Sequence, residues 1–145
     1  MQILALHGAF GSPAFWQQVE AALPAAVRGR WRALDLWREL PADHPEAALA
    51  ALAAGRPTLL VGYSLGGRLA LRAVVAHPER FAGALLIGAH PGLRDAEERE
   101  ARCQHDAAWA EAFEADPWPV FWEKWAAQPV FGGLTATPPP PPPRE

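Results

Sequence analysis

The order of apolar and polar positions along the chain predicts alternating strands and helices. Four short, mostly apolar runs are strand candidates, of which the second is the weaker. The third shows no polar alternation, as expected for a strand of a parallel sheet that helices cover on both faces. These runs span residues 2–6, 33–36, 58–61 and 82–87. Three helical patterns lie between them, at residues 12–24, 45–54 and 65–76. This order predicts an α/β fold with a parallel central sheet, flanking helices and right-handed crossovers.

The first helical pattern begins at Ser12 and Pro13, two residues that favour helix starts. Its apolar positions, Phe15, Val19 and Leu23, follow one another at a spacing of four residues. A four-residue spacing places side chains on one face of an α-helix. The pattern therefore predicts that these three side chains face the core.

The character of the sequence changes after residue 94, where a charged helix is expected at residues 96–104 and an aromatic segment follows. Trp118, Phe121, Trp122 and Trp125 recur at the spacing of one helix face. Two interpretations stay open: the aromatic face packs on the core, or it belongs to a helical cap and also roofs a pocket.

After Phe131, glycine, threonine and six consecutive prolines predict an extended, disordered tail. The expected domains are a partial core at 1–94, a helical cap at 95–131 and a tail at 132–145.

Composition narrows the classes of function. The 13 basic residues are scattered among 16 acidic ones and the net charge is −3, so a nucleic-acid binder is not expected. Cys103 is the single cysteine and forms no ligand set with the five scattered histidines, so neither a disulfide nor a metal site is predicted. No signal peptide or membrane-spanning run is present in the sequence, and a cytoplasmic protein is the expectation.

The strongest chemical signal is the sequence Gly62-Tyr63-Ser64-Leu65-Gly66. This G-x-S-x-G pattern follows an apolar run and precedes a helical pattern, as in a nucleophile elbow. Small flanking residues permit the sharp turn that holds a serine hydroxyl at the carboxyl end of a sheet. Ser64 is therefore the candidate nucleophile.

A glycine loop, residues 7–11, directly follows the first apolar run. Such a loop can turn backbone N–H groups toward the serine, and an oxyanion hole needs two of them. The expected pair is the N–H of Ala9 and the N–H of Leu65, the residue after the nucleophile. His7 is interpreted as a structural histidine that binds the loop rather than as a general base.

These motifs resemble those of the α/β-hydrolase fold, and within it those of the synthase family of menaquinone biosynthesis. The matching segments are residues 6–8 with Gly11, residues 61–68, residues 90–93, and Trp125 with residues 128–131. The first two motifs are shared by many α/β-hydrolases, whereas the last two are more particular to the synthases. The resemblance covers residues 1 to about 131.

The resemblance implies roles for several side chains. In that family a serine activated by His and Asp removes a proton and pyruvate is eliminated, without a metal or an organic cofactor. Ser64 matches the serine, Arg68 and Arg102 match residues that bind substrate carboxylates, and Trp125 matches an aromatic pocket wall. Arg68 also lies one helical turn after Ser64, so its guanidinium could reach a carboxylate there. Tyr63, beside the nucleophile, is expected to line the pocket or to pack in the fold.

In this fold the acidic residue and the histidine of the triad follow the cap, and no Asp or His lies beyond Phe131. His77, His90 and His105 follow Ser64 but are not promoted to general base. Since a serine without a base has little reactivity, the chain alone is expected to be nearly inactive. The expectation is a fragment, truncated or frameshifted near residue 131, with an apolar sheet edge that could self-associate.

Three functions remain open at this point. The leading one is a synthase of this family that acts on a small carboxylate. An ester, thioester or carbon–carbon bond hydrolase of the same fold is the first alternative. A non-catalytic scaffold, whose run of prolines at 138–143 docks a partner, is an alternative of another class.

Overall fold

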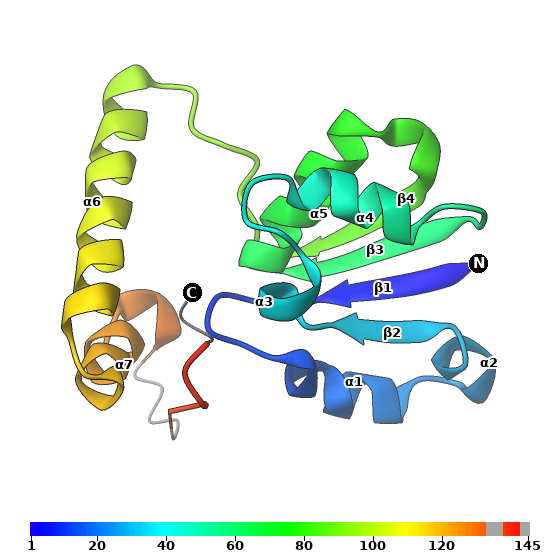
Figure 1. Cartoon of the computed structure of the whole chain (residues 1–145), viewed down its shortest axis with the longest axis horizontal. Coiled ribbons are helices and arrows are strands. Elements are labelled where there is room, and N and C mark those ends of the chain that lie inside the picture. The colour runs from blue at the N-terminus through cyan, green and yellow to red at the C-terminus, as the bar shows by residue number, and fades with distance from the viewer. Residues whose placement is uncertain (133–137, 143–145) are drawn as a thin grey trace. The chain divides into compact units, whose positions relative to one another are not determined.

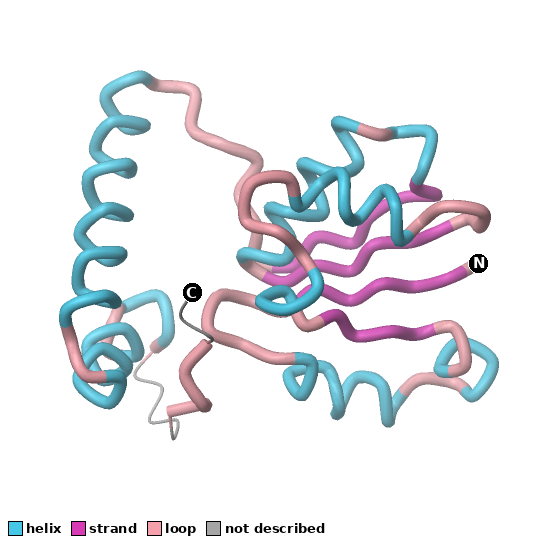
Figure 2. Tube along the Cα trace, viewed as in Figure 1, coloured by secondary structure: helices cyan, strands magenta, loops and turns pink. Residues whose placement is uncertain are grey.

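The computed structural model describes residues 1–132 and 138–142 (Figure 2). They divide into two compact units. The first unit comprises residues 1–91 with Pro142, and the second comprises residues 92–132 and 138–141. The division after Pro91 lies close to the domain boundary expected after residue 94. Each unit is described by itself.

The first unit contains a sheet of four parallel strands (Figure 1). The strands are β1 (Gln2–Leu6), β2 (Trp31–Leu34), β3 (Thr58–Tyr63) and β4 (Phe81–Ile87). Their order across the sheet is β2-β1-β3-β4, and each neighbouring pair is parallel. The predicted α/β fold with a parallel central sheet is confirmed. Strand β2 begins two residues before the predicted run and ends two residues earlier.

Helices of the first unit connect these strands. They are η1 (Pro13–Trp16), α1 (Gln17–Ala22), α2 (Ala25–Arg28), α3 (Leu36–Glu39), α4 (Pro45–Leu52), α5 (Leu65–Ala76) and η2 (Pro78–Arg80). The predicted helix at 65–76 matches α5 in both bounds. Helix α4 ends two residues before its predicted limit, because Gly55 with φ of +80° and Pro57 lie just beyond it.

Successive residues of β1 face opposite sides of the sheet and contribute to two apolar clusters. On one side Leu4 and Leu6, both fully buried, pack with residues of α4 and α5 such as Leu49 and Ala70. On the other side Ile3, Ala5 and Val61 pack with Trp16. Burial on both sides explains why the strand sequence shows no polar alternation.

The predicted inward face of the first helix is wrong. Trp16 is 3% exposed, whereas Phe15 is 48% and Val19 is 42% exposed. The segment begins as a 3₁₀ turn, whose three residues per turn rotate each position relative to an α-helix. This rotation directs Trp16 to the sheet, where its ring meets that of Trp31 edge-on with centroids 5.6 Å apart.

Strand β4 is less buried than the other strands, above all in its carboxyl half. Leu85, Leu86 and Ile87 are 54%, 37% and 41% exposed. Within the described residues β4 pairs with β3 alone and forms one edge of the sheet. An apolar sheet edge, which the sequence also predicted, is therefore present.

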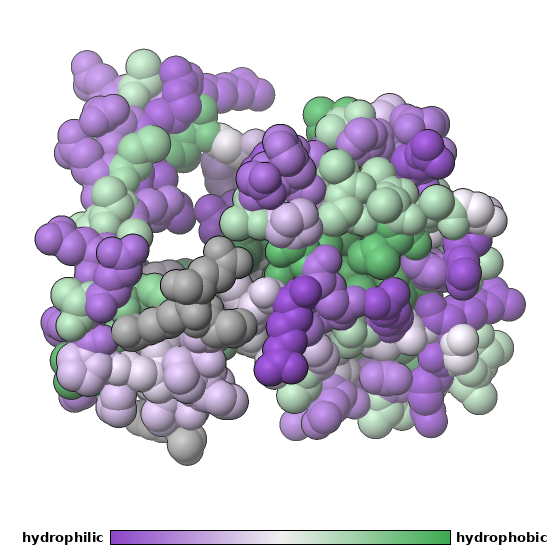
Figure 3. All heavy atoms as spheres, viewed as in Figure 1, coloured by the Kyte–Doolittle hydropathy of each residue, from purple (hydrophilic) through white to green (hydrophobic). Residues whose placement is uncertain are grey.

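The second unit consists of α6 (Ala96–Ala115), α7 (Trp118–Ala126) and η3 (Pro129–Phe131). Helix α6 is longer than the predicted helix at 96–104, because alanines and the aromatic Trp109 continue the helical pattern. The Asp95 carboxylate caps α6 by accepting from the N–H groups of Glu97 and Glu98. Most residues of α6 are exposed, and the face of α6 seen in Figure 3 is largely hydrophilic.

The aromatic face of α7 packs against α6. Phe121 is fully buried and its ring meets those of Trp109 and Phe113 at centroid distances of 5.8 Å and 5.2 Å. The aromatic face of α7 therefore contributes to the apolar interior between α6 and α7, and the two interpretations drawn from the sequence stay predictions. Of the predicted tail, residues 133–137 and 143–145 lie outside the described residues, and residues 138–142 form no helix or strand. The Trp118 Nε1–H donates to the Pro139 carbonyl at 2.7 Å.

Candidate active site

The turn from β3 into α5 holds Ser64 in a strained backbone conformation. Its φ of 51° and ψ of −111° lie outside the regions that non-glycine residues ordinarily occupy. The Ser64 N–H donates to the Ile87 carbonyl at 2.9 Å, and the Ser64 carbonyl accepts from the Arg68 N–H at 3.0 Å. Ser64 thus precedes the first residue of α5, where the helix dipole favours negative charge.

Three glycines permit this turn because their backbones lie against other chain segments. A Cβ on Gly66 would overlap the carbonyl oxygen of Leu6, and a Cβ on Gly62 would overlap Gly66. A Cβ on Gly67 would lie 2.6 Å from the Cβ of Ala89. No side chain fits at these distances, so the glycines of the G-x-S-x-G-G sequence are required for close packing of α5 onto the sheet.

The glycine loop after β1 lies beside Ser64. The Gly66 N–H donates to the His7 carbonyl at 3.1 Å, which joins the loop to α5. A Cβ built on Gly8 would stand 3.5 Å from the Ser64 Cβ. The structure therefore brings the loop that carries Ala9 next to the turn that carries Ser64 and Leu65. The N–H groups of Ala9 and Leu65 donate to no acceptor among residues 1–132 and 138–142.

His7 is fully buried and is held by two backbone groups. The Leu36 N–H donates to its Nε2 at 3.2 Å, so Nε2 is unprotonated and Nδ1 carries the hydrogen that faces the Gly8 carbonyl at 2.8 Å. Burial lowers the pKa of His7 below its ordinary value, against smaller opposing effects of the Gly8 hydrogen bond and of Asp35. Because the His7 ring is neutral and both of its nitrogens are hydrogen-bonded to the backbone, His7 holds the loop in place.

Tyr63 and Phe15 form a stacked pair near the nucleophile. Their ring centroids are 4.9 Å apart with an interplanar angle of 18°. A Cβ on Gly8 would stand 3.0 Å from the Tyr63 ring, so this ring lies between the glycine loop and Phe15. Sequence reasoning missed Phe15 as a residue of this site because it assigned Phe15 to the core. The position of Phe15 depends on tertiary packing, for which the apolar spacing in the sequence gives no signal.

The candidate substrate-binding residues divide between the two units. Arg68 is exposed on the first turn of α5, and its guanidinium makes no ion pair among the described residues. Arg102 and Trp125 belong to the second unit. The Arg102 Nε lies 2.7 Å from Asp106 Oδ1, and the Trp125 ring meets that of Trp109 edge-on at 5.0 Å. The roles predicted for Arg102 and Trp125 stay predictions.

The Ser64 hydroxyl has no hydrogen-bond partner among residues 1–132 and 138–142. Over the same residues no group of three or more His, Cys, Asp or Glu side chains is placed to hold a metal ion. No helix in the described part of the chain has the length and apolar character needed to cross a membrane. What the site offers is a strained serine, two candidate oxyanion donors and a nearby arginine.

Comparison with known proteins places these features in a family. Residues 3–144 match the model of the alpha/beta hydrolase family. A 2-succinyl-6-hydroxy-2,4-cyclohexadiene-1-carboxylate synthase of Klebsiella pneumoniae (strain 342) is 38% identical over 90% of this chain and 55% of its own length. The corresponding synthase of Enterobacter sp. (strain 638) is 37% identical over 91% of this chain and 54% of its own length. This chain therefore spans about half the length of the curated relatives it matches.

Among solved structures, MenH from S. aureus superposes with a TM-score of 0.67 at 20% identity. The match covers 90% of this chain and 53% of that one. Rv0554 from Mycobacterium tuberculosis gives a TM-score of 0.56 at 18% identity, over 88% of this chain and 49% of that one. At these identities the likeness concerns the fold.

Proposed function

The chain belongs to the alpha/beta hydrolase family, and from that membership we propose that Ser64 is the catalytic serine of a synthase site that eliminates pyruvate from a small carboxylate. The observation that carries the proposal is the strained Ser64 turn beside the glycine loop. The 37–38% identity to 2-succinyl-6-hydroxy-2,4-cyclohexadiene-1-carboxylate synthases supports the choice of substrate class.

In the proposed mechanism the Ala9 and Leu65 N–H groups stabilise negative charge that develops on a substrate oxygen. Donors fixed in place before the reaction act strongly because they need no reorganisation. The amino end of α5 adds to this stabilisation. A general base must take the proton of the Ser64 hydroxyl for the serine to act as a base or nucleophile. Since no described residue bonds this hydroxyl, we expect the chain alone to turn over substrate slowly.

Arg68 is the proposed carboxylate ligand of the first unit. It is one helical turn beyond Ser64, and its exposed guanidinium is not committed to an ion pair among the described residues. A guanidinium binds a carboxylate through two parallel hydrogen bonds. The product named for the relatives carries a succinyl carboxylate and a ring carboxylate. We propose that Arg68 binds one of them, and that Arg102 and Trp125 also contact substrate on the strength of their motif positions.

A titration of the full chain with 2-succinyl-6-hydroxy-2,4-cyclohexadiene-1-carboxylate tests this proposal. We expect saturable binding that Arg68→Gln weakens about tenfold, because a charge-assisted bidentate contact is lost. Arg72→Gln is the matched control, since Arg72 is also exposed on α5 but pairs with Glu46 at 3.1 Å. Equal weakening by both variants, or no binding, would contradict the proposed site.

An ester assay separates the hydrolase alternative. A synthase site is expected to release pyruvate slowly from the cyclohexene acid precursor, because no described residue bonds the Ser64 hydroxyl, and to hydrolyse p-nitrophenyl acetate more slowly still. Rapid ester hydrolysis that Ser64→Ala abolishes, with no binding of the cyclohexadiene acid, would assign the site to a hydrolase instead.

A further inference from the structure

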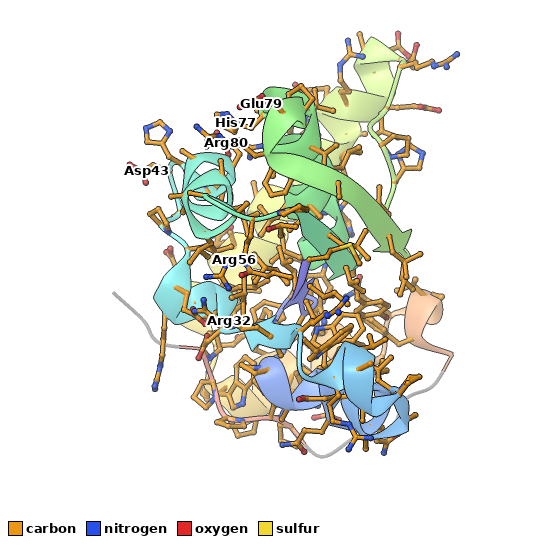
Figure 4. The ribbon with its side chains drawn as sticks, turned by 90° about the vertical axis from the view of Figure 1, so that its right-hand side faces the viewer. Arg32, Asp43, Arg56, His77, Glu79 and Arg80 are labelled. Carbon is orange, nitrogen blue, oxygen red and sulfur yellow. The ribbon has the colours of Figure 1, made fainter. Side chains whose placement is uncertain are left out.

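Arginines stand at the amino ends of three of the four strands. Arg30 directly precedes β2, Arg56 lies two residues before β3, and Arg80 directly precedes β4. Because the strands are parallel, all their amino ends lie at the same end of the sheet, which we call its amino edge. Ser64 lies at the opposite end, where the carboxyl ends of the strands are. Figure 4 shows this face, with Arg56 between Arg32 and Arg80. We call Arg30, Arg56 and Arg80 the amino-edge arginines.

The strand order sets the spacing of the amino-edge arginines. Neighbouring strands lie roughly 5 Å apart. Arg56 and Arg80 precede the adjacent strands β3 and β4, so their backbones are about one strand spacing apart. Arg30 and Arg56 are separated by the width of β1, or about 10 Å. The arginines thus form a row along the edge.

Two open hollows of about 440 Å³ and 450 Å³ lie along this row and share Arg56. The first hollow also contains Arg80 and Glu79, and the second contains Arg30, Arg32 and Trp31. Glu79 is the one acidic residue among all the lining residues of both hollows. The lining is therefore strongly positive in a chain whose net charge is −3.

Two of the four arginines that line the hollows lack a nearby counter-charge. The guanidinium groups of Arg30 and Arg56 make no ion pair or hydrogen bond to any residue in 1–132 or 138–142. Arg80 Nε lies 3.4 Å from Glu79 Oε1, and both side chains are half exposed or more. Arg32 pairs with Glu39. Like charges held in a row repel one another, and a bound anion with several charges would relieve this repulsion.

We propose that the amino-edge arginines bind the polyphosphate group of a small molecule. Guanidinium forks match phosphate oxygens in geometry, and successive phosphates supply charges along the length of a chain. A single carboxylate would engage one arginine and leave the others unneutralised. Trp31 and Leu52 in the second hollow offer apolar surface beside Arg30, which suits the organic part of a nucleoside polyphosphate.

Calorimetric titration of the full chain with inorganic tripolyphosphate at low ionic strength tests the proposal. We expect binding that Arg56→Gln weakens about five- to tenfold, because Arg56 lines both hollows. Arg72→Gln, which removes the same charge from a different surface, is expected to bind as the unaltered chain does. Added salt is expected to weaken binding, since exposed charges are screened.

Three results would overturn the proposal: no binding of tripolyphosphate, equal losses in Arg56→Gln and Arg72→Gln, or a loss in Arg68→Gln larger than that in Arg56→Gln. The last result would place the anion at the Ser64 site. A parallel titration with ATP distinguishes the source of the phosphates, because tighter binding of ATP would indicate a nucleoside in the hollow that contains Trp31. Binding of the cyclohexadiene acid is measured separately, so failure of either proposal leaves the other testable.

Discussion

Close backbone packing around Ser64 depends on single residues. Gly66 lies against the carbonyl groups of Leu6 and His7, and its own N–H donates to the His7 carbonyl. The hydrogen bond and the contact together hold α5 against the carboxyl end of β1. The strained φ of Ser64 is maintained by these neighbours, because strain persists only where surrounding contacts outweigh it.

Gly66→Ala is expected to destabilise the fold by about 3 kcal/mol or more, because the added methyl group overlaps backbone atoms that cannot rotate away. The midpoint of urea unfolding measures this loss. Gly29→Ala is the matched control: its Cβ would stand 3.7 Å from the Ala25 carbonyl oxygen, an ordinary contact, and the backbone there is helical. Similar midpoints for the two variants would contradict the close approach at Gly66.

Burial of His7 makes stability depend on pH. Because the pKa of His7 is lowered in the folded state, the unfolded chain takes up this proton first as the pH falls below about 6.5. The free energy of unfolding is therefore expected to decrease from that pH down to the folded pKa, and the His7 contribution is then constant. Above about pH 7.5 both states are neutral at His7 and its contribution vanishes.

His7→Gln tests this dependence, because an amide can donate to the Gly8 carbonyl and accept from the Leu36 N–H without titrating. The variant is expected to show a smaller decrease in unfolding free energy between about pH 7 and pH 5 than the unaltered chain. His44→Gln, at an exposed position, serves as the control. An unchanged pH dependence in His7→Gln would show that another group causes it.

At the scale of elements, residues 2–6 and 65–76 could be predicted from the sequence because apolar burial and backbone hydrogen bonding agree there. The sequence alone could not show which face of the first helix packs on the sheet. The choice between a 3₁₀ and an α-helical turn after Pro13 depends on the packing of Trp16 against Trp31. An apolar run alone cannot show whether a strand is central or at an edge, and β4 illustrates this.

The exposed half of β4 is expected to promote self-association. Leu85 pairs in register with Val61, which belongs to an apolar cluster, yet Leu85 itself is 54% exposed. Unpaired edge strands with apolar side chains can add strands from another copy. Leu85→Glu is therefore expected to reduce concentration-dependent association, as measured by sedimentation velocity. Val75→Glu, on the 73%-exposed Val75 of α5, is expected to change it little, and an equal effect would exclude a specific role of the edge.

At the scale of the whole molecule, the two units contain different candidate residues. The first unit contains Ser64, Ala9, Leu65, Tyr63 and Arg68, which the motif order places near the carboxyl ends of β1 and β3 and on the first turn of α5. Their functional roles stay predictions. Phe15 was missed since its place depends on tertiary packing. The amino-edge arginines were missed because only the strand order unites residues 30, 56 and 80.

The central claim is that the fold makes Ser64 more reactive than an ordinary serine. Ser12 is the one other serine in the sequence and serves as an internal control. The measurement is the rate at which a fluorophosphonate labels each serine of the full chain, followed by peptide mass spectrometry. Oxyanion donors accelerate such reactions even without a general base. We predict labelling of Ser64 at least about tenfold faster than that of Ser12. Equal labelling of the two serines would contradict the claim.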